Sequence, residues 1–183
     1  GLFLAAYEKI TGDSAYHELA VKCFDEFLEF IKNSSKINSA AKYSLGYTTG
    51  ISGILWALYN SGKYLDENRL LKSAKKGLAL FKTCILSHDS ELDIMGGAAG
   101  GAITAAAFYK LSGDKKLLKF AEECAKYLLA KHVKYEKWLL WPSAHAYKPL
   151  TGFAHGASGY ALALAKVYDI TDNDLFKEAA LEA

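Results

Sequence analysis

Cysteine is scarce in this chain, with three residues among 183 and no Cys-x-x-Cys pair. An odd number without paired spacing gives no sign of a disulfide framework or of a zinc motif built from cysteine pairs. We interpret Cys23, Cys84 and Cys124 as small buried apolar residues. Because this pattern requires no oxidising environment, we expect a reducing compartment, the cytoplasm.

Prolines are few as well, and the net charge is small. The two prolines, Pro142 and Pro149, fall within one loop, which leaves the rest of the chain free to form helices. The formal net charge of +2 is too small to predict binding to nucleic acid or to an anionic membrane. No apolar run reaches the ~18 residues of a transmembrane helix. These absences leave an ordinary globular protein of about one domain by length.

The chain does have a repeated glycine-rich turn that leads into an apolar helix. Three copies are complete, and a partial copy begins at Gly1. The glycines of the complete copies are Gly46, Gly50, Gly53, Gly97, Gly100, Gly152, Gly156 and Gly159. The copies follow one another at intervals of about 50 residues, which is typical of architectures in which no repeat buries its own apolar face.

Each repeat contains a glycine turn, an apolar helix, a short polar turn and an amphipathic helix. The repeats run approximately over residues 1–49, 50–96, 97–155 and 156–183, and the polar turns are expected at 11–13, 61–63, 112–114 and 171–173. The apolar helices, starting near residues 1, 50, 98 and 157, should be buried on all sides. The second helices, such as 15–33 and 116–132, carry apolar residues along one face. This pattern of apolar inner helices and amphipathic outer helices predicts an all-α fold. We expect an α/α toroid, formed by a single domain over 1–183.

Long connections lead into the three complete glycine turns, at residues 34–49, 86–96 and 133–155. We expect all three to meet at one end of the toroid, where the inner helices begin. Long loops in a compact domain are often functional. The third connection holds Trp138, Trp141 and Tyr147, which either line a groove for a peptide or hold the loop in place.

Two ionisable residues interrupt the glycine pattern at this end. Asp93 occupies the position that Gly46 and Gly152 hold in the other turns, and His155 directly precedes Gly156. An imidazole suits general acid–base catalysis, and a carboxylate can exchange a proton or orient a partner. The alternative is structural, with the histidine capping its helix and the carboxylate accepting backbone hydrogen bonds.

The other histidines give weaker signals. His17 and His132 lie on polar faces or at ends of outer helices, and His88 and His145 lie in loops with no cysteine or acidic partner at ligand spacing. We find no metal-binding signature within the chain. A nucleophile elbow, a phosphate loop and a dinucleotide fingerprint are also missing from the sequence.

Two segments, Leu92–Gly100 and Pro149–Gly159, strongly resemble the LanC-like cyclase domain of lanthipeptide synthetases. The likeness is greatest to the C-terminal domain of the bifunctional type 2 enzymes and extends over essentially the whole chain. It implies an α/α toroid of seven helical hairpins around a zinc ion. The chain would cover the N-terminal to middle part of that domain, about four hairpins.

The resemblance also implies a reaction. The family adds cysteine thiols of a precursor peptide to dehydroalanine or dehydrobutyrine, which forms the thioether rings of lantibiotics, and zinc lowers the thiol pKa so that the thiolate attacks. The aspartate of the family's Asp-x-x-x-Gly turn matches Asp93, and the histidine of its His-Gly motif matches His155. Both are implied to handle protons. The family's zinc ligands, a cysteine and a Cys-His pair, have no match here and are expected C-terminal to Ala183.

This mismatch leads to expectations for the isolated chain. It should bind no zinc, form no rings, and self-associate through helix faces that a closed toroid would cover. Two other classes of function stay open. One is an α/α-toroid scaffold that binds peptides without chemistry. The other is a different α/α-toroid enzyme such as a glycosidase, which would need a pair of carboxylates at the same end.

Overall fold

The computed structural model describes residues 1–33, 44–83 and 86–183. This part of the chain is mainly helical, and its one sheet has two strands. The all-α prediction is therefore confirmed, whereas closure into a toroid stays a prediction. The chain divides into two compact units, the first formed by Gly1–Lys42 with Ile54–Cys84 and the second by Tyr43–Gly53 with Ile85–Ala183.

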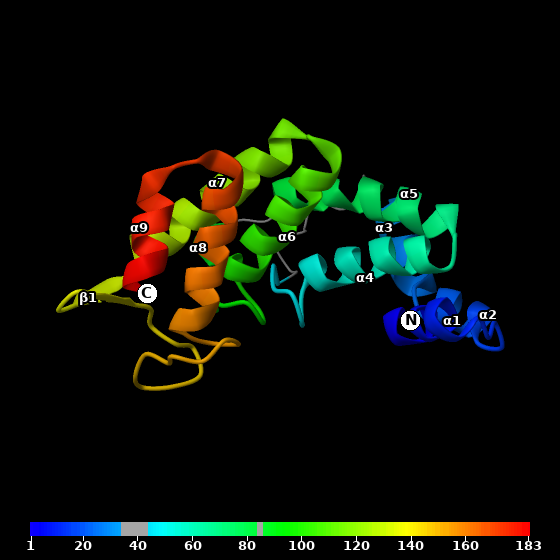
Figure 1. The fold of residues 1–183 in the computed structure, drawn as a ribbon, viewed down its shortest axis with the longest axis horizontal. Coiled ribbons are helices and arrows are strands. Elements are labelled where there is room, and N and C mark those ends of the chain that lie inside the picture. The colour runs from blue at the N-terminus through cyan, green and yellow to red at the C-terminus, as the bar shows by residue number, and fades with distance from the viewer. Residues whose placement is uncertain (34–43, 84–85) are drawn as a thin grey trace. The chain divides into compact units, whose positions relative to one another are not determined.

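The first unit is built from short helices (Figure 1). They are α1 (Leu2–Thr11), α2 (His17–Lys22), α3 (Asp25–Asn33), most of α4 (Ile51–Tyr64), α5 (Asn68–Gly77) and the 3-10 helix η3 (Leu78–Thr83). The amphipathic helix predicted over 15–33 is broken between α2 and α3. Cys23 lies at the break and is exposed, so its predicted burial is wrong. The helical register that placed it on the apolar face ends there.

Helix α1 shows that an apolar sequence does not ensure burial. Its prediction as a helix buried on all sides is wrong, because Phe3 is 77% and Ile10 83% exposed. Ala5 is its one fully buried residue and packs with Ala20 and Leu65. An apolar face is buried only where another element packs against it, and α1 has such a neighbour on one side. Self-association through the other side stays a prediction.

The second unit holds the longer helices (Figure 1). Its elements are the 3-10 helix η4 (Leu86–His88), α6 (Ala98–Ser112), α7 (Lys115–Lys131), β1 (Val133–Tyr135), β2 (Trp138–Leu140), α8 (Ala157–Thr171) and α9 (Asp174–Glu182). Helix α6 packs against α7 and α8, and α8 packs against α9. Nine residues of α6 are buried, which fits the predicted inner helix. Cys124 of α7 is buried, as predicted, and Cys84 lies outside the described residues.

All four predicted starts of apolar helices are confirmed, since α1, α4, α6 and α8 begin at residues 2, 51, 98 and 157. Three of the polar turns are also found. Gly12, Gly113 and Asp172 adopt the left-handed conformation that ends α1, α6 and α8. Asp114 and Asn173 then accept a hydrogen bond from the backbone N–H two residues later, which caps α7 and α9.

The polar turn predicted at 61–63 is wrong, because α4 continues to Tyr64. Gly62 lies inside this helix. A Cβ at this position would be 2.8 Å from Cγ of Leu71, so the glycine leaves room for this side chain of α5. The glycine that led to the prediction of a turn at 61–63 therefore serves a packing contact within the first unit.

Candidate functional site

The three complete glycine turns, all in the second unit, share one backbone arrangement. A Cβ on Gly53, Gly100 or Gly159 would collide with the carbonyl oxygen six residues earlier, so each position requires glycine. The N–H groups of Ile51 and Ala157 each donate to a carbonyl seven residues earlier, at 2.9 Å. A common scaffold therefore places the same positions of each turn in the same local geometry.

The turn before α6 departs from this scaffold through its acidic residues. The N–H of Ala98 donates to Oδ2 of Asp89 at 2.7 Å, where the other turns use a backbone carbonyl. Oδ1 of Asp89 accepts from the N–H groups of Glu91 and Leu92 at 3.1 and 3.2 Å. Burial raises the pKa of Asp89, and these backbone hydrogen bonds act in the opposite direction. Asp89 thus fixes the loop from which Glu91 and Asp93 project.

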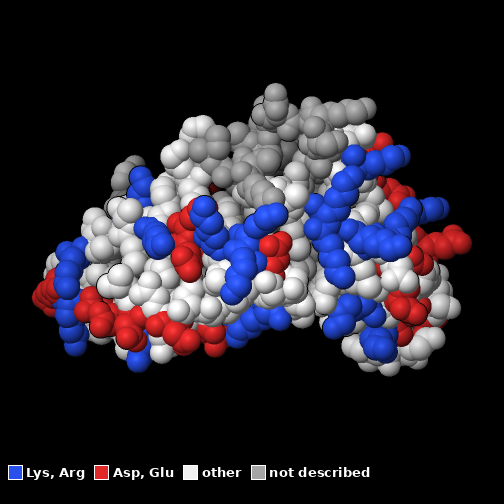
Figure 2. All heavy atoms as spheres, turned by 90° about the horizontal axis from the view of Figure 1, so that it is seen from above, with Lys and Arg blue, Asp and Glu red and all other residues white. Residues whose placement is uncertain are grey.

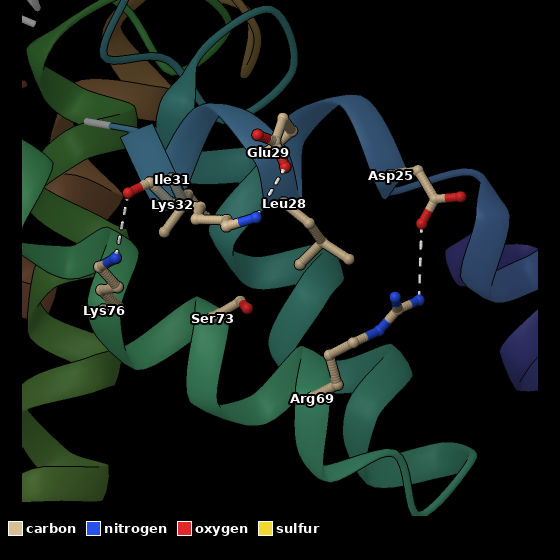
Figure 3. A pocket seen from close by; sticks show the side chains of 8 residues that line it. All are labelled: Asp25, Leu28, Glu29, Ile31, Lys32, Arg69, Ser73 and Lys76. Carbon is tan, nitrogen blue, oxygen red and sulfur yellow. Dashed lines mark hydrogen bonds and ion pairs between the residues drawn. The ribbon is translucent and has the colours of Figure 1, made fainter. Parts of the chain in front are cut away.

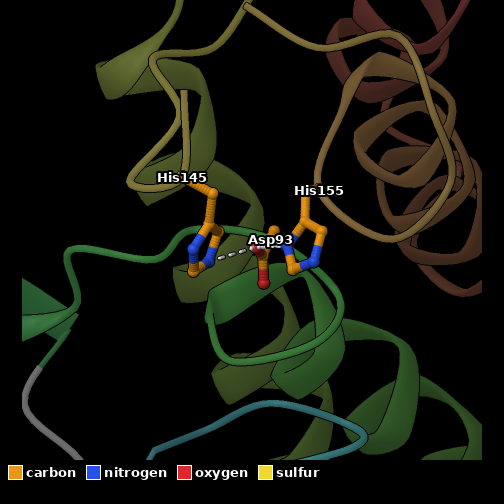
Figure 4. A group of neighbouring side chains, drawn as sticks. All are labelled: Asp93, His145 and His155. Carbon is orange, nitrogen blue, oxygen red and sulfur yellow. Dashed lines mark hydrogen bonds and ion pairs between the residues drawn. The ribbon is translucent and has the colours of Figure 1, made fainter. Parts of the chain in front are cut away.

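Asp93 is almost completely buried, with 3% of its side chain exposed. Its Oδ1 accepts a hydrogen bond from the N–H of Gly96 at 2.8 Å. Its Oδ2 lies 2.6 Å from Nδ1 of His155, which comes from the turn before α8 (Figure 4). Both oxygens are therefore hydrogen-bonded within the protein.

The contact with Asp93 fixes the tautomer of His155. Nδ1–H donates to the carboxylate, which leaves the lone pair of the neutral ring on Nε2. The side chain is 34% exposed, and Nε2 has no hydrogen-bond partner among the described residues. An imidazole that is oriented by a buried carboxylate and open at its other nitrogen is suited to general acid–base chemistry. The structure thus brings together the two residues that the sequence singled out.

His145 lies in the same place, which the sequence did not predict. It belongs to the loop after β2, and its ring centroid is 4.5 Å from that of His155 (Figure 4). Its Nε2 is 2.7 Å from Oε2 of Glu91 and 3.8 Å from Oδ2 of Asp93. The acidic partner that sequence spacing did not provide comes from the loop before α6. The one available signal was that His145 lies in a long connection leading into a glycine turn.

Tyr160, the residue after Gly159, borders this acidic region. Burial raises the pKa of its phenol, and Asp93, Asp89 and Glu91 raise it further. The hydroxyl is buried and has no hydrogen-bond partner among the described residues. Three carboxylates thus lie close enough to Tyr160 to act on its phenol.

The chain matches the family described as lanthionine synthetase C-like protein over residues 1–183. It belongs to this family. No curated protein gives a significant match. The Asp93 and His155 pair therefore lies in a LanC-like domain.

Zinc is the metal that the LanC-like family implies, and Asp93, His145 and His155 have suitable donor types. One ligand atom from each lies within 4.8 Å of the others. Ligands about 2.0 to 2.1 Å from a tetrahedral zinc ion are roughly 3.3 Å apart. The 2.6 Å between Asp93 and His155 is a hydrogen-bond distance instead. The arrangement fits a hydrogen-bonded pair and does not fit a formed zinc centre.

The three aromatic residues proposed for a peptide groove differ in position. Trp141 is buried, donates from Nε1 to the carbonyl of Leu128 at 2.8 Å, and stacks on Tyr160 with centroids 4.6 Å apart. It holds the loop in place, the alternative that the sequence left open. Trp138 on β2 and Tyr147 are exposed, and peptide binding by them stays a prediction.

The first unit contains a separate pocket of about 630 Å³ between α3 and α5 (Figure 3). Leu28 and Ile31 are the apolar residues that line it. Two of its cations face carboxylates of the same pocket, since Arg69 lies 3.5 Å from Asp25 and Lys32 lies 3.6 Å from Glu29. No histidine or cysteine lines it. The pocket therefore lacks the imidazole side chains that mark the site in the second unit.

The surface charge agrees with the small net charge. Figure 2 shows Lys and Arg side chains gathered over the part of this face where α5 lies, with both signs mixed elsewhere. Helix α5 carries Arg69, Lys72, Lys75 and Lys76, all exposed. Among the described residues, no helix combines the length and the apolar character needed to cross a membrane.

Proposed function

We propose that this LanC-like chain is part of a peptide cyclase that adds a cysteine thiol of a precursor peptide to dehydroalanine or dehydrobutyrine, forming the thioether rings of a lantibiotic. Membership of the family supports the reaction class. The observation that carries the assignment of residues is the 2.6 Å contact that leaves Nε2 of His155 open and Asp93 buried.

In this proposal the two residues have different roles. His155 takes the thiol proton on Nε2, while Asp93 accepts the Nδ1 hydrogen bond and stabilises the imidazolium that forms. Asp93 is a positioning residue, because its two oxygens are bound to Gly96 and His155. This division refines the expectation that both residues exchange protons with the substrate.

The test uses His155→Ala in the full-length enzyme and a dehydrated precursor peptide. Loss of a proton-transfer group should slow ring formation by about 10² to 10⁴. Dehydration should stay unchanged, so dehydrated peptide with free thiols accumulates. Thiol alkylation followed by mass spectrometry counts the rings.

His88→Ala is a matched control, since His88 is exposed in η4 of the same unit. Normal ring formation by the His155 variant would return both residues to a structural role and favour the scaffold that binds peptides without chemistry. The glycosidase alternative is less supported, because Asp93 is committed to His155 and Gly96 and is not free to act as a catalytic acid.

A further inference from the structure

A second carboxylate–imidazole pair stands beside the first. Oε2 of Glu91 lies 2.7 Å from Nε2 of His145, and the His145 ring is 4.5 Å from that of His155, centroid to centroid. The side chain of His145 is 47% exposed. With Nε2 directed at Glu91, Nδ1 is the nitrogen left for a ligand. Among the described residues the two imidazoles thus each have a carboxylate on one nitrogen and an open second nitrogen.

Hydrogen bonds to nearby residues hold the loops that carry both members of this pair. Trp141, four residues before His145, is fixed by its hydrogen bond to Leu128 and by stacking on Tyr160. The N–H of His145 also donates to Oγ of Ser143 at 3.0 Å. On the other side, the N–H of Glu91 donates to Oδ1 of the partly buried Asp89 at 3.1 Å. The 2.7 Å contact therefore joins two ordered loops.

The proposed cyclisation requires two proton transfers at different atoms. The S–H bond breaks, the sulfur forms a bond to the β-carbon, and the π electron pair moves to the α-carbon, where a C–H bond then forms. The net change is one proton moved from sulfur to carbon, without any oxidant or reductant. One group must accept the proton from sulfur, and a group in another position can supply the proton to carbon.

We propose that His145, paired through Nε2 with Glu91, is a second catalytic residue that donates a proton from Nδ1 to the α-carbon. This inference rests on the proposed cyclase function. His155, oriented by the buried Asp93, is the base. The adjacent His145 exchanges protons with solvent because it is more exposed, so it can be reprotonated after each turnover. Donation from one fixed imidazole would set the configuration of the new α-carbon centre.

The test follows both rate and stereochemistry with His145→Ala in the full-length enzyme and a dehydrated precursor peptide. We expect ring formation to slow by about 10²-fold. We also expect a mixture of lanthionine diastereomers, because water then protonates the enolate from both faces. Hydrolysis, derivatisation and chiral gas chromatography with mass spectrometry give the diastereomer ratio. Glu91→Gln, which keeps the shape but removes the charge, should slow the reaction less.

His88→Ala and a reaction without enzyme are the controls, and circular dichroism checks that each variant folds. A His145 variant that is slow but still gives one diastereomer overturns the donor role and leaves the residue with a structural one. Wild-type rate and purity overturn the inference completely. Failure of the unchanged enzyme to form rings above the background rate is a different result, because it overturns the proposed cyclase function itself.

Discussion

Among the described residues, each unit has a cluster of histidine and carboxylate side chains, and the two clusters use the imidazole in opposite ways. In the first unit, Nδ1 of His17 lies 3.0 Å from Oε1 of Glu8 and Nε2 lies 3.4 Å from Oε1 of Glu67. Both nitrogens are occupied, and the ring joins α1, α2 and the residue that precedes α5. In the second unit, Asp93 holds only one nitrogen of His155.

The difference shows what makes a paired histidine suitable for chemistry. A ring clamped on both nitrogens can stabilise the fold but cannot accept a proton from a substrate. A ring held on one side by a buried carboxylate is oriented and still has a free nitrogen. Pairing with a carboxylate is common to both clusters, so pairing alone does not identify the site.

The largest expected effect comes from Asp93→Asn, which tests the oriented tautomer directly. The amide oxygen can still accept from Gly96, but the amide NH₂ faces Nδ1 of His155 and favours the tautomer with its proton on Nε2. Ring formation in the full-length enzyme should fall by about 10² to 10⁴, which is roughly 3 to 5 kcal/mol on the barrier. Single-turnover kinetics measure the rate, and ¹⁵N NMR of the imidazole reports the tautomer.

The control for this change lies in the other cluster. Glu8→Gln weakens a histidine–carboxylate contact of the clamped type and should leave the rate of ring formation unchanged. A wild-type rate for the Asp93 variant, or a loss of equal size in both variants, would remove the distinction between an orienting and a clamping carboxylate.

A smaller effect is expected from Gly100→Ala, which tests the scaffold that positions Asp93. The new Cβ would collide with the carbonyl oxygen of Ile94 and crowd the N–H of Tyr47, 2.6 Å away. We expect a loss of about 3 kcal/mol in the free energy of unfolding, measured by urea denaturation. Gly152→Ala is the matched control, because a Cβ there meets no atom within 4 Å. Equal stability of the two variants would contradict the shared-scaffold interpretation.

The smallest effect is the contribution of His17, Glu8 and Glu67 in the first unit to the pH dependence of the free energy of unfolding. The hydrogen bond that His17 donates to Glu8, followed by the one it donates to Glu67, raises the pKa of His17 above 6.5. The folded state therefore holds a proton that the unfolded state releases, and this contribution is complete below pH 6.5 and lost as pH rises through the raised pKa. Because the cluster is partly exposed, the contribution should stay below about 1 kcal/mol.

Urea unfolding at pH 6 and pH 9 tests whether the free energy of unfolding falls as the pH rises. His17→Ala should lose the part of the pH dependence that falls in this window, and His88→Ala should retain it. A wild-type chain whose stability increases from pH 6 to pH 9 through His17 would show that the clamp acts on the neutral ring.

Sequence by itself determined the features that depend on local geometry. The spacing of glycines and apolar residues gave the starts of α1, α4, α6 and α8 to within about two residues. Aligning the repeats also singled out Asp93 and His155, because a residue that breaks a repeated turn stands out without any knowledge of its neighbours. Helix periodicity and turn chemistry act over a few residues, so the sequence shows them directly.

Tertiary structure alone decided which side chains meet and which stay exposed. The contact of His155 with Asp93 spans 62 positions, and Glu91, the partner of His145, lies 54 positions before it. The exposure of Phe3 and the burial of Trp141 likewise depend on packing neighbours. Hydrogen bonds and burial across such separations are set by how whole elements pack. The occupancy of each imidazole nitrogen, which separates His17 from His155, could therefore not be inferred from spacing along the chain.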